Sequence, residues 1–127
     1  MKGRPADVQF AFDHGTEAPR KARRAVAELF DRPDDPIAEA VLLAVSELVT
    51  NVVMHSGDGG VVKAWNPSVD GRLRVEVEDH SPIPPTVGGE ANIGGRGLLI
   101  VDRTADAWGV EPRRPGKVIW AEFSRPL

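Results

Sequence analysis

The chain has 127 residues, of which 41% are hydrophobic and 28% charged, and its formal net charge at pH 7 is −3. This length and composition predict a single globular domain over residues 1–127, without room for a second packed core. The weakly acidic balance disfavours nucleic acid and membrane surfaces as partners, because both usually require a basic face. There are no cysteines, which excludes disulfides and thiolate zinc sites. The polar first residues and short apolar runs indicate neither a signal peptide nor a membrane span, so we expect a cytoplasmic protein.

Hydrophobic spacing and turn signals define the elements of the first half. Apolar residues alternate over 8–12, which predicts a strand with one buried face. Thr16 can cap a helix that runs to about residue 31. Asp35 and Pro36 then form a helix start signal, as N-cap and first helical residue. The helix that follows ends at the glycine-rich run 56–60, and its apolar face consists of Val41, Val45, Leu48, Val49, Val52 and Val53.

The second half predicts a hairpin over residues 61–65 and 72–78, then a long Pro/Gly-rich loop over 80–97. A short helix over 98–105 and two closing strands over 108–110 and 118–123 complete the chain. A loop of this length in a compact domain is usually functional or disordered. The complete order is β-α-α-β-β-α-β-β. It predicts an α+β fold, a two-layer sandwich in which three helices pack on one face of a largely antiparallel mixed sheet.

A row of polar residues interrupts the long helix. Glu47, Asn51 and His55 recur at intervals of four along one edge of it. Asp79 ends a predicted strand, and the glycine-rich run 94–97 opens the next helix, where free N–H groups suit phosphate. Together these groups predict a nucleotide and metal site. The alternative, in which the polar row is only the solvated face of the helix, stays open on the residues alone.

These residues match motifs of a known family. Residues 47–55 resemble the N-box, E-x-x-x-N-x-x-x-H, of the GHKL (Bergerat-fold) ATPase superfamily. Asp79 stands where the D-x-G box of that family begins, residues 95–98 resemble its G-x-G-L box, and 116–118 its closing strand. Order and spacing agree over roughly residues 8–124. The chain looks most similar to the histidine-kinase-like ATPase domains of anti-sigma-factor serine kinases.

The resemblance implies ATP and Mg²⁺ as cofactors. Asn51 would coordinate the Mg²⁺, and Asp79 would accept a hydrogen bond from the exocyclic amine of adenine. Glu47 would be the catalytic base that takes the proton of an acceptor serine. His55 has a structural role in this interpretation. The implied nucleotide-binding set is Asn51, Asp79, Ser81, Gly95, Arg96, Gly97 and Leu98.

The resemblance also implies a function and partners. The chain would be a serine/threonine-protein kinase that phosphorylates a STAS-type anti-sigma-factor antagonist, binds a sigma factor and regulates transcription by partner switching. Whether it acts as a monomer or a homodimer stays open.

Departures from the family pattern define an alternative. The glycines of the D-x-G-x-G box are replaced at Ser81 and Ile83, the lid between residues 85 and 94 is short, and Lys117 stands where the family often has a phosphate-contacting threonine. The alternative is a non-catalytic module of the same fold, with or without nucleotide, that sequesters a sigma factor. A metal-binding domain without ATP is disfavoured, since the three histidines lie on separate elements without ligand spacing.

Overall fold

A computed structural model describes residues 4–32, 34–55, 59–66, 71–80, 93–114 and 116–124, without the side chains of residues 55 and 93–97. Within these residues there are three helices and five strands, in the order that the sequence predicts. Their bounds are β1 Val8–Phe12, α1 Ala18–Ala27, α2 Ala38–His55, β2 Gly60–Trp65, β3 Arg72–Asp79, α3 Ile93–Thr104, β4 Ala107–Arg113 and β5 Gly116–Ser124.

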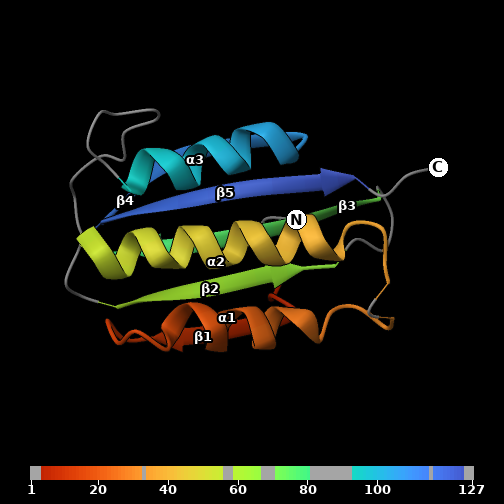
Figure 1. Cartoon of the computed structure of the whole chain (residues 1–127), viewed down its shortest axis with the longest axis horizontal. Coiled ribbons are helices and arrows are strands. Elements are labelled where there is room, and N and C mark those ends of the chain that lie inside the picture. The colour runs from red at the N-terminus through yellow and green to blue at the C-terminus, as the bar shows by residue number, and fades with distance from the viewer. Residues whose placement is uncertain are drawn as a thin grey trace.

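The strands form a sheet in the order β1-β2-β3-β5-β4, and every neighbouring pair in it is antiparallel. The mixed character that we predicted is therefore not present among the described strands. Figure 1 shows α1, α2 and α3 side by side in front of the sheet, with α2 in the middle. The α+β class is confirmed.

The core lies between the helices and the sheet. Strand residues alternate between the two faces, and on β3 the fully buried ones are Leu73, Val75 and Val77. The apolar stripe of α2 faces them and is also fully buried at Val41, Val45, Leu48 and Val49. The periodicities that predicted the strands and the long helix therefore also predict the core.

The helix ends differ from the prediction. The N-cap residue of helix α1 is Glu17, so the cap predicted at Thr16 is wrong. Glu17 itself makes no side-chain cap hydrogen bond. Its C-terminal end is tighter than an α-helix, since the N–H groups of residues 28–30 donate to carbonyl groups three residues back. Asp35 Oδ1 accepts a hydrogen bond from the Ile37 N–H at 3.2 Å, but α2 starts at Ala38, so Asp35 caps the turn before the helix and the start predicted at Pro36 is two residues early.

Helix α3 starts at Ile93, five residues before the predicted start. The glycine-rich run 94–97 is therefore the first part of the helix and not the loop before it. Glycine is a weak helix former, so propensity alone placed the boundary too late. Leu98 and Val101 anchor the helix, because both are fully buried in the core. Residues 81–92 of the predicted loop lie outside the described residues.

One end of the molecule collects several chain segments. In Figure 1 the last turn of α2, the start of α3 and the start of β5 lie at the left. The end of β3 lies there too, because Asp79 pairs with Lys117 near the start of β5. We call this region the left end. None of the described helices is both long and apolar enough to cross a bilayer.

Candidate functional site

The polar row of α2 runs from a partly exposed position to a buried one. Glu47 is half-buried, whereas Asn51 is only 7% exposed. Asn51 follows the fully buried Ala44 and Leu48 at helical spacing, so it lies on a buried flank of α2, in its last turns. His55 is the last residue of α2, and its side chain lies outside the described residues. The row is therefore more than a solvated helix face, because one of its members is inside the protein.

Asp79 is the last residue of β3 and is 5% exposed. Its side chain continues the series Leu73, Val75 and Val77, so it lies on the helix-covered face of the sheet. A carboxylate at the end of an otherwise apolar row needs a partner, because an isolated buried charge is strongly unfavourable.

Lys117 is that partner. It stands opposite Asp79 in the register of β3 and β5, and its Nζ lies 2.8 Å from the Asp79 Oδ2. The two side chains are 9% and 6% exposed, so the ion pair is buried. The sequence identified Lys117 as a departure from the family pattern but did not predict this contact.

Glycines allow the neighbouring strands to approach the end of β3 closely. A Cβ at Gly116 would lie 1.9 Å from the carbonyl oxygen of Asp79. A Cβ at Gly60, on the other side of β3, would lie 2.0 Å from the carbonyl oxygen of Glu78. Both positions therefore exclude any side chain. The close approach at Gly116 brings the backbone next to Lys117 against the end of β3.

A small polar pocket of ≈ 90 Å³ adjoins the ion pair. It is lined by Glu78, Asp79, His80, Arg113, Arg114, Lys117 and Val118. Sites for small molecules usually measure about 300–1,000 Å³, so this pocket alone is smaller than a nucleotide requires. Asn51 is not among its lining residues.

The other predicted site residues differ in where they lie. Gly95, Arg96 and Gly97 lie in α3 near its N-terminus, which Figure 1 places at the left end. Leu98 is fully buried, so its side chain contributes to the core. Ser81 lies outside the described residues. The structure thus brings Asn51, Asp79 and the start of α3 to one end of the molecule.

The residue types at this end fit ATP and Mg²⁺, which the resemblance implies, with one difference. An amide oxygen such as that of Asn51 is a suitable ligand for a hard cation, and the carboxylate of Asp79 is a suitable acceptor for an amine. The difference is that Asp79 already accepts a hydrogen bond from Lys117. A base that contacts Asp79 would therefore share it with an ammonium group. Among the described residues, no cluster of three or more His, Cys, Asp or Glu side chains is placed to hold a metal by itself.

Comparison with known proteins agrees with this reading. Residues 13–123 match the model of the histidine kinase-like ATPase domain. The chain is also similar to an uncharacterized protein of Streptomyces coelicolor, with 36% identity over 85 residues, which covers 61% of this chain and 79% of that protein. Because the family match spans most of the chain and the observed order of helices and strands is the one predicted, this protein belongs to the histidine kinase-like ATPase domain family.

Proposed function

We propose that this protein is an ATP-binding regulator and that its left end holds ATP with Mg²⁺. The observation that carries the proposal is the placement of two buried polar residues, Asn51 and Asp79, at the end where α3 begins. Membership of an ATPase-like family supports the choice of nucleotide. In this proposal Asn51 holds the metal ion and Asp79 binds the amine of adenine.

We further propose that the regulator is a serine/threonine-protein kinase. Glu47 is half-buried and lies one helical turn before Asn51 on the same flank of α2. It would take the proton of a serine hydroxyl as the serine oxygen bonds to the γ-phosphorus, while the bond from that phosphorus to the β,γ-bridging oxygen breaks and ADP leaves. A STAS-type anti-sigma-factor antagonist would supply the serine, and a sigma factor would be the second partner. The protein would bind both partners in the cytoplasm.

A second candidate has an observation in its favour. The buried contact between Lys117 and Asp79 engages the carboxylate that would otherwise read adenine. This contact favours a module of the same fold that binds nucleotide weakly or not at all, and acts by sequestering a sigma factor.

Nucleotide binding can be tested by calorimetry with ATP, in the presence of Mg²⁺ and then of a chelator. We expect magnesium-dependent binding that Asn51→Ala abolishes. Asn66→Ala is the matched control, because Asn66 follows β2 and its side chain donates to the carbonyl oxygen of Leu29, away from the left end. Absence of any binding to the wild-type chain would leave only the nucleotide-free module.

The kinase step requires a separate test. The wild-type chain, Glu47→Gln and Glu39→Gln would each be incubated with labelled ATP and an antagonist. Glu39 is an exposed carboxylate on the same helix, in its first turn, and serves as the control. We expect transfer to serine with the wild type and the control, and loss of transfer with Glu47→Gln. Nucleotide binding without transfer by the wild type would favour the non-catalytic module.

A further inference from the structure

The ion pair between Lys117 and Asp79 contains a lysine that the proposed nucleotide site does not by itself require. Reading an amine needs only an acceptor, which Asp79 supplies. Lys117 adds a donor 2.8 Å from that acceptor, on the neighbouring strand and at the same depth in the protein. The two side chains therefore present opposite hydrogen-bonding characters next to each other.

The chemistry of the two groups is complementary to one edge of a purine. An ionised carboxylate only accepts hydrogen bonds, and an ammonium group only donates them, to as many as three acceptors at once. Adenine carries the reverse pattern, since its exocyclic amine donates and the ring nitrogens on either side of it, N1 and N7, accept. A base whose amine contacts Asp79 would have one of these nitrogens directed towards the lysine side of the carboxylate.

We propose that Lys117 is a specificity-determining residue for the base, which donates a hydrogen bond to a ring nitrogen beside the amine while Asp79 accepts from the amine. This inference rests on the proposed binding of ATP. In it, Asp79 has two tasks: it contacts the base and it holds the ammonium group in place. The base is then recognised by the pair and not by the carboxylate alone.

Stability alone does not account for a pair in this place. Replacing a buried ion pair by apolar residues is often neutral or stabilising, so burial of Lys117 and Asp79 gains the fold little. The pair also lies where the helix-covered face ends, next to the pocket at His80 and Arg114, and not in the middle of the core. Recognition of the base explains why both a donor and an acceptor lie at this position.

The experiment compares ATP with two analogues, 1-deaza-ATP and 7-deaza-ATP, each of which replaces one ring nitrogen by C–H and leaves the amine intact. Dissociation constants would be measured by calorimetry with Mg²⁺. We expect one of the two analogues to bind the wild-type chain about tenfold more weakly than ATP, because it leaves a charged donor without its acceptor. Which analogue is weaker identifies the nitrogen that Lys117 contacts.

Variants assign the effect to Lys117. In Lys117→Met the ratio of the two dissociation constants should fall to about one, because no donor is left to distinguish nitrogen from C–H. Lys63→Met is the matched control, since Lys63 pairs with Glu78, the neighbour of Asp79, on the opposite face of the sheet. Its ratio should equal that of the wild type. Thermal melting would establish that each variant is folded.

The outcomes separate this inference from the proposed function. If ATP binds and neither analogue is weaker, or if the difference persists in Lys117→Met, Lys117 does not read the base although the nucleotide site stands. If ATP does not bind at all, both proposals are wrong. Should Lys117→Met fail to fold, Lys117→Gln replaces it, because glutamine keeps an N–H donor for Asp79. Its ratio should be lower than that of the wild type, because a neutral N–H forms a weaker hydrogen bond than an ammonium group.

Discussion

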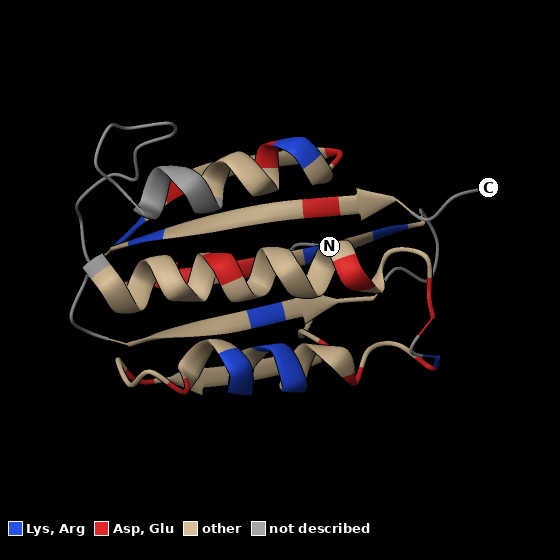
Figure 2. Cartoon of the chain, viewed as in Figure 1, with Lys and Arg blue, Asp and Glu red and all other residues tan. Residues whose placement is uncertain are grey.

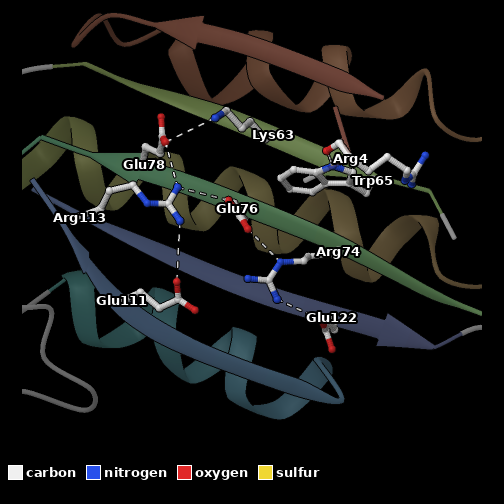
Figure 3. A network of polar contacts seen from close by, with 9 residues as sticks. All are labelled: Arg4, Lys63, Trp65, Arg74, Glu76, Glu78, Glu111, Arg113 and Glu122. Atoms are coloured by element: carbon white, nitrogen blue, oxygen red, sulfur yellow. Dashed lines mark hydrogen bonds and ion pairs between the residues drawn. The ribbon is translucent and has the colours of Figure 1, made fainter. Parts of the chain in front are cut away.

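The two faces of the sheet both carry ion pairs, but in different arrangements. On the face away from the helices, Arg74 pairs with Glu76 and Glu122, at 2.9 and 3.0 Å. Arg113 pairs with Glu76, Glu78 and Glu111, and Lys63 with Glu78 (Figure 3). On the helix-covered face, Lys117 pairs with Asp79 at 2.8 Å.

The difference shows which charges hold the sheet together and which point to a site. Members of the outer network share partners, so each can be lost while others compensate, even though Glu76 is only 8% exposed. Lys117 and Asp79 lie at the end of an apolar layer, where the loss of one deprives the other of a buried ion pair. Figure 2 shows the charges spread over the strands and the exposed helix faces, so charge alone does not mark a functional region. Burial alone does not mark one either, since Glu76 is as buried as Lys117; the pair at Asp79 differs by lying on the helix-covered face, at the end of an apolar row.

Lys117→Met tests this comparison with the largest expected effect. Removal of one member of a buried ion pair typically lowers the free energy of unfolding by about 3–5 kcal/mol. Asp79, which is 5% exposed, would lose the ammonium group that pairs with it. Urea unfolding of the variant and the wild type would measure the loss. A loss below about 1 kcal/mol would mean that the pair behaves like a surface pair.

Gly116→Ala should have the next largest effect. The added Cβ would lie 1.9 Å from the Asp79 carbonyl oxygen, so β5 must move away from β3. We expect the free energy of unfolding to fall by about 2–3 kcal/mol, as for other overpacked sites. Gly71→Ala is the control for the substitution itself. Gly71 has φ 82° and open space around it, so its loss should be only about 1 kcal/mol, from backbone conformation. Equal losses at the two sites would argue against the close approach at Asp79.

Arg74→Met should have an intermediate effect on the outer face. The guanidinium of Arg74 pairs with two carboxylates and lies over the Trp120 ring, 4.6 Å from its centroid. Methionine keeps part of the packing but none of these charge interactions, so we expect a loss of about 1–2 kcal/mol. Chemical unfolding at low and high salt would measure it. A loss as large as that of Lys117→Met would show that the outer network is as critical as the buried pair.

Most of the fold could be predicted from the sequence, because alternation and helical spacing are local signals. The row Leu73, Val75 and Val77 identified a strand and its buried face together. The start of α3 was misplaced at residue 98, since glycine propensity favours a loop over 94–97, whereas the helix begins at Ile93.

The site could be predicted only in part. Asn51 and Asp79 were recognised because they belong to sequence motifs, and the fold places both at the left end. The contact of Asp79 with Lys117 could not be seen, because 38 residues separate the two and because β3 and β5 are neighbours without being consecutive. Knowledge of the strand order would have revealed it, since opposite charges in register on adjacent strands form cross-strand pairs.

Lys63→Met is the smallest expected effect and the strictest test of the contrast between the faces. Lys63 and Glu78 are 3.6 Å apart, with 27% and 20% of their side chains exposed, and Glu78 keeps Arg113 at 3.2 Å when the lysine is removed. We expect a loss of no more than about 0.5 kcal/mol in urea unfolding at low salt, and less at high salt, where partly exposed charges are screened. Lys117→Met removes the same type of side chain from the strand on the other side of β3, so the ratio of the two losses isolates the effect of burial. If both variants lost the same free energy, neither burial nor position would distinguish the pair at Asp79, and its assignment to a site would lose its energetic basis.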